Sequence, residues 1–362
     1  MSRPLAIAHV TPYAWDSGHE VNVQIARTAD ELAARGHRVL IVAPSTSSAD
    51  VRAGRAAIRK QQDLFSADGA PRVLAVGEAI PAPVGARRRA ALPVDVARTV
   101  EQLLTDAAPD ICHVHEPYAP SVASVALRHS RALNVGTFHA PIERVVSTQL
   151  ARKVVDLVFG RLDARLASFH ATADLLNRFF PADYQVLMPG ADVAPGDRDG
   201  APVRIAFVEE EERAALRVFL RALRRIDHFG DWQALVRSPR GQTATATLRH
   251  ELRNRVLFLD DVSESDLLAD ADVCVLASDG VAPAPALALR GIPAGAVPLA
   301  TSLAVYEEVT GEGEHGLLFA PRDVDTCAAQ LQRLISDAAL RERLRKSAEP
   351  LRRSLAWSRL AD

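Results

Sequence analysis

The chain has 362 residues, of which 48% are hydrophobic and 24% are charged, the mixture of an ordinary globular protein. This length exceeds what a single hydrophobic core usually organises, so we expect two domains. The 43 lysines and arginines nearly balance the 45 aspartates and glutamates, which leaves no global charge that would hold nucleic acid. Any attraction to a charged surface must therefore be local.

Three cysteines, Cys112, Cys274 and Cys327, stand far apart in the chain. Neither a CxxC pair nor a group of histidines at zinc-ligand spacing occurs, so the sequence predicts reduced structural thiols, no metal site and no cofactor. The first ten residues lack the features of a signal peptide, and no apolar run is long enough to span a bilayer. We expect a cytoplasmic protein that at most touches the inner face of the membrane.

In the first half of the chain, short apolar runs alternate with segments of helical periodicity. Strands are expected at Leu5–Val10, Val39–Ala43, Ile111–Val114, Asn134–Phe138 and Leu166–His170, and helices at Val21–Arg35 and Val94–Leu104. This alternation predicts βαβ units with right-handed crossovers, and hence a parallel sheet covered by helices on both faces.

Residues 188–202 are rich in Pro, Gly and Asp and have no period, which is typical of a linker. The alternation then resumes, with strands expected at Val203–Val208, Arg255–Leu259, Asp272–Leu276 and Val297–Ala300, and helices at Arg213–Ile226, Ser263–Ala269, Asp323–Ile335 and Leu340–Leu355. We therefore expect an N-terminal domain over residues 1–190 and a C-terminal domain over residues 191–362.

The predicted fold class is α/β, with two Rossmann-like parallel-sheet domains that face each other across a cleft. Ligands of open parallel sheets lie beyond the carboxyl ends of the strands, so the loops that follow the strands are where functional residues are expected.

Several short motifs lie in those loops in a fixed order. They are His9-Val10-Thr11-Pro12-Tyr13 with Asp16 and Gly18, Ala33 to Val39, His113-Val114-His115-Glu116-Pro117, Gly136 to Ala140, Pro189 to Asp192, Val262-Ser263, Ala271 to Val273, Ala294 to Pro298 and Glu314 to Leu318. Each motif is weak alone, but the ordered series resembles the retaining GT-B glycosyltransferases of the family that includes phosphatidylinositol mannosyltransferases. The resemblance covers nearly the whole chain and implies an acceptor-binding N-terminal domain and a donor-binding C-terminal domain.

The resemblance implies a donor site with an arginine and a lysine after the first strand of the second domain. These cations would stabilise the negative charge that gathers on a leaving nucleoside diphosphate. Here Glu210 stands at the place of the arginine, within a run of four glutamates at residues 209–212, and Ala215 stands at the place of the lysine. Four carboxylates would repel a diphosphate. The alternatives are a solvated acidic helix start and a rebuilt metal site, and the residues favour the first.

The family also places two glutamates, separated by seven residues, before the next Ala-Gly turn. Counting back from Ala294-Gly295, those positions are Ala282 and Arg290, and neither side chain accepts a hydrogen bond. Pro283 and Pro285 are expected to disturb the helix start there. Arg290 is either a relocated phosphate cation or an exposed helix arginine. The donor half of the family site is thus predicted to be dismantled.

The acceptor half keeps more of the family pattern. Tyr13, Asp16, Gly18 and His19 form an opening loop where the family carries a glycine pair, with a helix cap or turn as the alternative role of Asp16 and His19.

His139 ends a strand where a related histidine contributes to the reacting centre, so it is the candidate catalytic residue. The alternative is a structural histidine bonded to backbone. His115 and Glu116 end the preceding strand, and Glu116 is expected to brace its loop.

Arg87, Arg88 and Arg89 form the only dense basic run in the first half, followed by the amphipathic segment Leu92–Leu104. Because the lipid-using relatives carry a basic amphipathic helix here, Arg87 is a candidate for contact with an anionic lipid or an acceptor phosphate. A solvated loop is the alternative.

The preferred hypothesis is a glycosyltransferase homologue that has lost ordinary donor chemistry and binds a glycolipid, a sugar or a protein partner, with a nucleotide sugar bound weakly. The alternative is an active retaining glycosyltransferase with an unusual donor site. An NAD-dependent oxidoreductase is excluded because no G-x-G-x-x-G follows a first strand in either half.

Overall fold

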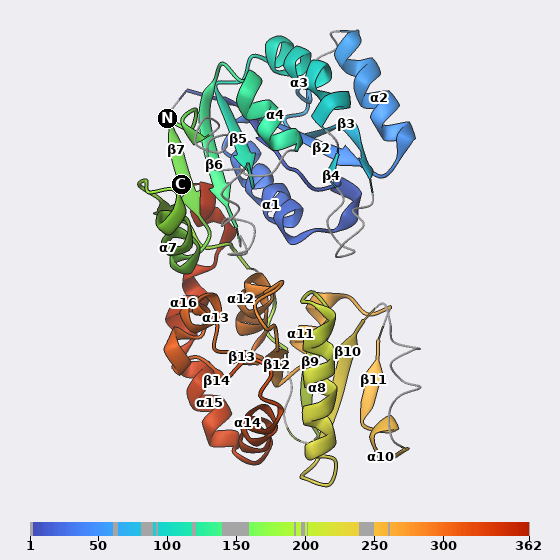
Figure 1. Ribbon diagram of the computed structural model, residues 1–362, viewed down its shortest axis with the longest axis vertical. Coiled ribbons are helices and arrows are strands. Elements are labelled where there is room, and N and C mark those ends of the chain that lie inside the picture. The colour runs from blue at the N-terminus through green and yellow to red at the C-terminus, as the bar shows by residue number, and fades with distance from the viewer. Residues whose placement is uncertain are drawn as a thin grey trace. The chain divides into compact units, whose positions relative to one another are not determined.

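The computed structural model describes residues 3–60, 64–80, 90–91, 93–117, 121–139, 159–191, 193–196, 200, 202–238, 250–259 and 261–361 (Figure 1). The chain divides into two compact units, the first made of Met1–Met188 with Trp357–Asp362 and the second of Pro189–Ala356. Within the part described, no helix is long and apolar enough to cross a membrane.

The first unit is built on an eight-stranded sheet with the order β4-β3-β2-β1-β5-β6-β7-β8, in which only β4 is antiparallel to its neighbour. The strands are β1 (Ala6–Val10), β2 (Arg38–Ser45), β3 (Arg72–Ile80), β4 (Ala90–Ala91), β5 (Ile111–His115), β6 (Leu133–Phe138), β7 (Ala164–Ala167) and β8 (Gln185–Val186). The helices include α1 (Glu20–Ala34), α2 (Ser48–Arg59), α3 (Pro93–Ala107), α4 (Val122–His129) and α7 (His170–Phe179), with the short 3-10 helices η1 (Trp15–Ser17) and η3 (Trp357–Ala361).

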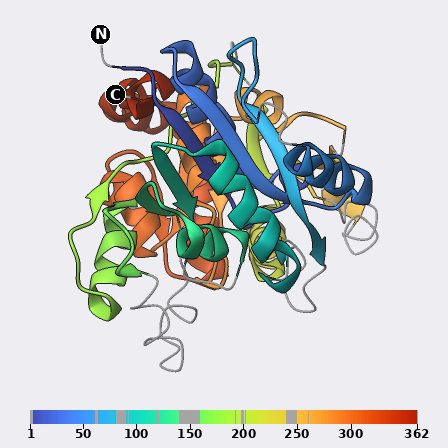
Figure 2. The same cartoon turned by 90° about the horizontal axis from the view of Figure 1, so that it is seen from above.

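Helices cover both faces of this sheet (Figures 1 and 2). Alternate residues of each strand point to opposite faces, so each strand packs against helices on both sides. Leu40 and Val42 of β2 pack with residues of α2, α3 and α4, whereas Val39 and Ile41 pack with Val21, Ile25 and Ala29 of α1. Both faces are therefore buried, which explains the continuous apolar runs that predicted a parallel sheet.

The second unit has six parallel strands in the order β11-β10-β9-β12-β13-β14. They are β9 (Val203–Val208), β10 (Trp232–Arg237), β11 (Val256–Phe258), β12 (Val273–Leu276), β13 (Val297–Thr301) and β14 (Leu317–Phe319). The helices are α8 (Arg213–Arg225), α10 (His250–Arg253), α11 (Glu264–Ala269), α12 (Pro285–Ala294), α13 (Ala304–Val309), α14 (Val324–Ser336), α15 (Ala338–Ser347) and α16 (Glu349–Ser354), with η2 (Gly311–Gly313).

Two sets of helices also flank this second sheet. Ile205 and Phe207 of β9 pack in one core with residues of α8 and α14. On β12, Val273 and Val275 join that core, while Cys274 faces Gly291 of α12 on the other side. Two Rossmann-like parallel sheets, each covered by helices, confirm the predicted α/β fold class.

Three expectations about the elements are corrected. The strand expected at Leu166–His170 ends at Ala167, and His170 begins α7. The helix expected at Leu340–Leu355 is two helices, α15 and α16, because Pro350 lies in the first turn of α16 and cannot continue a helix from the residues before it. The last residues group with the first unit, where Arg35, the residue after α1, donates a hydrogen bond to the Ser358 carbonyl at 2.6 Å.

Candidate functional site

Histidines gather at the carboxyl ends of three neighbouring strands of the first unit. The parallel register aligns His9 of β1 with His113 of β5, and His115 of β5 with Thr137 of β6. Since every second residue of a strand shares a face, His9, His113, His115 and Thr137 all lie on one face, and His139 follows two residues after Thr137. We call His9, His113, His115 and His139 the histidine row.

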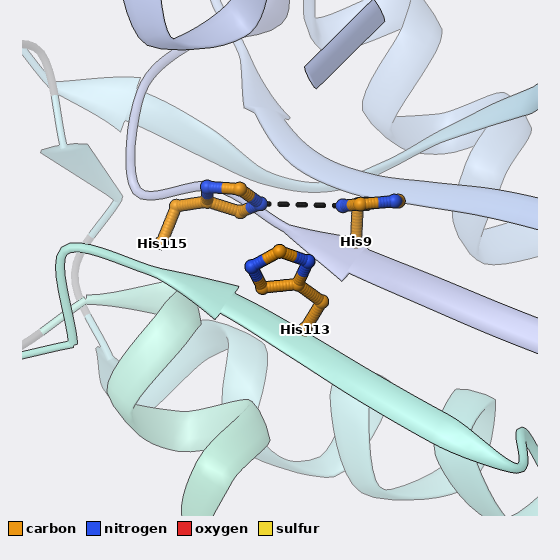
Figure 3. Close-up of side chains that lie close together, drawn as sticks. All are labelled: His9, His113 and His115. Atoms are coloured by element: carbon orange, nitrogen blue, oxygen red, sulfur yellow. Dashed lines mark hydrogen bonds between the residues drawn. The ribbon is translucent and has the colours of Figure 1, made fainter. Parts of the chain in front are cut away.

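Hydrogen bonds connect the members of the histidine row. His9 Nδ1 lies 3.2 Å from His115 Nε2 (Figure 3), and His115 Nδ1 lies 3.0 Å from His139 Nε2. The Nδ1 of His139 lies 3.1 Å from Ser168 Oγ, while His113 Nε2 lies 2.6 Å from Thr137 Oγ1. The candidate catalytic residue His139 therefore has both ring nitrogens engaged by side chains of its own unit.

Burial keeps the histidine row uncharged. It lowers the pKa of His9 to about 4 and, with a smaller contribution from His19, the pKa of His139 to about 3. Burial and the neighbouring histidines hold the pKa values of His113 and His115 well below their usual range. Each imidazole is thus neutral at neutral pH, with one nitrogen that donates and one that accepts.

Glu116 connects the ends of β5 and β6. Its buried carboxylate accepts a hydrogen bond from the backbone N–H of His139 at 2.7 Å through Oε1. Glu116 itself has a φ of 51°, the left-handed region, where the chain turns sharply out of β5. His115, Glu116 and His139, which the sequence singles out separately, are therefore brought together.

The other acceptor-side candidates lie in the loop between β1 and α1. The rings of Tyr13 and His19 stack with centroids 3.5 Å apart, and His19 Nδ1 caps α1 by accepting from the Val21 N–H. The Asp16 carboxylate accepts from the Thr46 N–H at 3.1 Å. Gly18 has a φ of 62°, which suits glycine at this turn. Arg87 lies outside the described residues.

In the second unit, Glu210 and Arg290 form an ion pair. Arg290 Nη2 lies 3.0 Å from both carboxylate oxygens of Glu210, and its Nε donates to Glu264 of α11. All three side chains are mostly buried, so Arg290 is not the exposed helix arginine that one expectation described. The resemblance implies arginine at position 210 and glutamate at position 290, so the two charges are reversed here.

The next two glutamates bind backbone amides at the carboxyl end of β12. Glu211 accepts from the N–H groups of Ala277 at 2.7 Å and Ser278 at 3.0 Å, and from the Tyr306 hydroxyl. Glu212 accepts from the N–H groups of Asp279 and, at 3.1 Å, Ala282. We call the four N–H groups of residues 277, 278, 279 and 282 the amide cradle.

The expectation of a solvated acidic helix start at residues 209–212 is wrong. Glu209 is 4% exposed and Glu211 is 6% exposed, and Glu209 accepts a hydrogen bond from Ser238 Oγ. The reason is tertiary, since the loop after β9 lies against the ends of β10 and β12, whose donors satisfy these carboxylates. Burial raises the pKa of Glu211 to about 8, against the effect of its donors.

One further donor-half expectation also needs correction. Pro285 is the first residue of α12, where proline fits because its missing N–H would have no helical partner, so it starts that helix rather than disturbing it. Ala215 is fully buried in the core beneath α8.

Comparison with known proteins agrees with the geometry. The model for Glycosyltransferase Family 4 matches residues 21–194, and that for Glycosyl transferases group 1 matches residues 203–337. The chain belongs to the GT-B glycosyltransferases. A phosphatidyl-myo-inositol mannosyltransferase of Mycolicibacterium smegmatis is 24% identical over 93% of this chain and 86% of its own length. One from Mycobacterium leprae is 25% identical over 99% and 94%.

Solved structures of other GT-B glycosyltransferases have the same fold. A sucrose-phosphate synthase of Thermosynechococcus elongatus superposes with a TM-score of 0.76 at 17% identity, covering 99% of this chain and 96% of that one. A glycosyltransferase of Rickettsia africae gives 0.72 at 14% identity with the same coverage. An Anabaena protein solved with UDP and glucose gives 0.66 at 14% identity, covering 99% and 97%.

Sequence reasoning missed five residues of these two clusters as parts of a site, namely His9, His113, Glu211, Glu212 and Tyr306. The His113-x-His115 spacing is a usable signal, because two histidines two apart in a strand share a face. No local signal shows that Glu211 and Glu212 turn toward β12, since that contact joins residues more than sixty positions apart.

Proposed function

We propose that this GT-B glycosyltransferase homologue has lost ordinary nucleotide-sugar chemistry and acts as a binding or regulatory protein, descended from a lipid-directed hexosyl- or mannosyltransferase. The observation that carries the proposal is the occupation of the amide cradle by the carboxylates of Glu211 and Glu212.

Backbone N–H groups at a strand end and before a helix are the groups that would hold a phosphate. Here those donors are already engaged by carboxyl groups of the chain. A diphosphate would have to displace the carboxyl groups of Glu211 and Glu212 and approach Glu210 as well. Repulsion between like charges at about 4–6 Å costs on the order of 1 kcal/mol or more per pair. Arg290, which sits on Glu210 and Glu264, is already neutralised by them.

The proposal predicts that GDP-, UDP- and ADP-hexoses bind with dissociation constants weaker than about 100 μM, equivalent to about 5.5 kcal/mol. Isothermal titration calorimetry on the full chain measures this directly, with an active GT-B glycosyltransferase titrated beside it as the positive control. A tighter constant for any of the three would contradict the loss of donor binding and would favour an active retaining enzyme with an unusual donor site, with His139 near the reacting centre.

The surviving function is proposed to lie in the first unit, as binding of an anionic lipid or glycolipid at the inner face of the membrane. Two facts support this. The curated relatives are phosphatidyl-myo-inositol mannosyltransferases, and the sequence carries the basic run at residues 87–89. The first unit also keeps Tyr13, His19, His115 and His139 at strand ends or in the loops that follow them. A protein partner for the same unit is the competing explanation.

Replacing Arg87→Ala together with Arg88→Ala is expected to weaken association with anionic vesicles about tenfold or more, because each surface arginine contributes about 1 kcal/mol near such a membrane. Vesicle sedimentation at low and high salt measures it, and the salt dependence should flatten. The matched control is Arg52→Ala with Arg59→Ala, which removes two exposed arginines from α2. Equal losses of vesicle association in both double variants would mean that the attraction to the membrane is nonspecific. No loss of vesicle association in either would favour the protein partner.

A further inference from the structure

Three members of the histidine row lie close enough to share one ligand. His9, His113 and His115 each offer a ring nitrogen, and the three nitrogens lie within 4.8 Å of one another. In Figure 3, His9 and His115 point toward each other along the dashed line, and the His113 ring lies beside that line. The three come from two adjacent strands, so the sheet holds their Cα atoms in fixed positions.

The distance between His9 and His115 fits a tetrahedral metal ion. Zinc binds imidazole nitrogen at about 2.0–2.1 Å, so two nitrogens on one tetrahedral ion lie about 3.3–3.4 Å apart. His9 Nδ1 and His115 Nε2 are 3.2 Å apart. A metal ion can therefore replace the proton that these two nitrogens share, and a ring nitrogen of His113 lies within 4.8 Å of both.

Two of the three rings, His113 and His115, also resemble metal ligands, whose second ring nitrogen is ordinarily held by another group. His113 Nε2 lies 2.6 Å from Thr137 Oγ1, and His115 Nδ1 lies 3.0 Å from His139 Nε2. The buried carboxylate of Glu116, next to His115 in the chain, supplies a negative charge that a bound cation would favour. His113 is partly exposed, which gives an ion a way in.

An independent observation concerns His9. Its ring is 1% exposed, and its Nε2 has no hydrogen-bond partner among the described residues. A buried polar atom without a partner is rare, because it has given up its hydrogen bonds to water. The one hydrogen bond of His9 uses Nδ1, the nitrogen that faces the proposed ion, so the protein keeps an imidazole here although its other nitrogen is unused.

We propose that His9, His113 and His115 bind one divalent transition-metal ion of the zinc class through three imidazole nitrogens, with a fourth coordination position open. Imidazole suits Zn²⁺, Co²⁺, Ni²⁺ and Cu²⁺, whereas Mg²⁺ and Ca²⁺ prefer oxygen ligands. This site lies within the first unit and does not depend on whether the second unit binds nucleotide sugars.

The test uses the full, untagged chain, stripped of metal by a chelator and titrated with Co²⁺ and then Zn²⁺. We expect one Co²⁺ per chain with the strong visible absorption of four-coordinate cobalt, its displacement by Zn²⁺, and a Zn²⁺ dissociation constant near 1 μM or tighter. X-ray absorption of the zinc-loaded protein should show three imidazole ligands. A cobalt spectrum typical of six oxygen ligands, or no binding, would overturn the proposal and leave a purely structural hydrogen-bonded row.

The variant His113→Ala removes the partly exposed ligand and is expected to weaken Zn²⁺ binding at least 100-fold. The matched control is His228→Ala, which removes a histidine whose side chain is 82% exposed in the second unit. Equal affinity of His113→Ala and the unmodified protein would overturn the proposal. Because His9→Ala opens a buried space and can lower stability, the absorption measurement on the unmodified protein decides the ligand set independently of that variant.

Discussion

Arg290→Glu is expected to lower the free energy of unfolding by about 3 kcal/mol or more, because removing one partner of a mostly buried ion pair leaves uncompensated charge. Arg290 lies between Glu210 and Glu264, so the substitution creates three neighbouring carboxylates. Urea denaturation of the variant beside the unmodified protein measures the loss. The control Arg343→Glu, an exposed arginine of α15, should change stability by no more than about 0.5 kcal/mol.

Adding Glu210→Arg to Arg290→Glu should recover at least about 2 kcal/mol, since the double variant again places a cation against carboxylates. This double variant has the charge order that the family resemblance implies for positions 210 and 290. A loss equal to the sum of the two single losses would show that the pair is not coupled. Nucleotide-sugar affinity should stay weak in the double variant, because Glu211 and Glu212 still occupy the amide cradle.

Glu211 should make stability fall as the pH rises. Burial raises its pKa from 4.5 to about 8, so the folded protein holds a proton that the unfolded chain releases above pH 4.5. The unfolded state then binds fewer protons, and the free energy of unfolding decreases between about pH 5 and pH 8. The shift corresponds to about 3–5 kcal/mol. Glu264, with a pKa raised to about 7 by burial, acts in the same direction.

The measurement compares the change in unfolding free energy between pH 5 and pH 8 in the unmodified protein and in Glu211→Gln, whose side chain does not titrate. The difference isolates Glu211, because the histidines of the first unit titrate equally in both proteins. Glu342→Gln, at an exposed position of α15, serves as the control and should match the unmodified protein. Identical pH dependence in Glu211→Gln and the unmodified protein would mean that Glu211 stays ionised, held by Tyr306 and its backbone donors.

The alternation of strands and helices could be predicted from the sequence. Both faces of each parallel sheet are buried, so each strand appears in the sequence as a short apolar run. Val203–Val208 has the bounds that the sequence predicts. The strand β3 was missed, since Arg72, Gly77 and Glu78 interrupt its apolar pattern. The short helix α16 was merged with α15 because the leucines at positions 340, 344, 351 and 355 keep a helical spacing across the break.

The sequence by itself placed Glu210 and Arg290 at the family's donor positions, because position 210 is found from the first strand of the second domain and position 290 by counting back from the Ala-Gly turn. Only the tertiary structure decided that the two side chains meet, that Glu211 and Glu212 turn into the amides after β12, and that strand register gathers four histidines. The reason is physical: a residue's charge and local periodicity are properties of the chain nearby. The burial of a carboxyl group and the hydrogen-bond partner of an imidazole depend instead on which strand end, distant in the sequence, packs against these side chains.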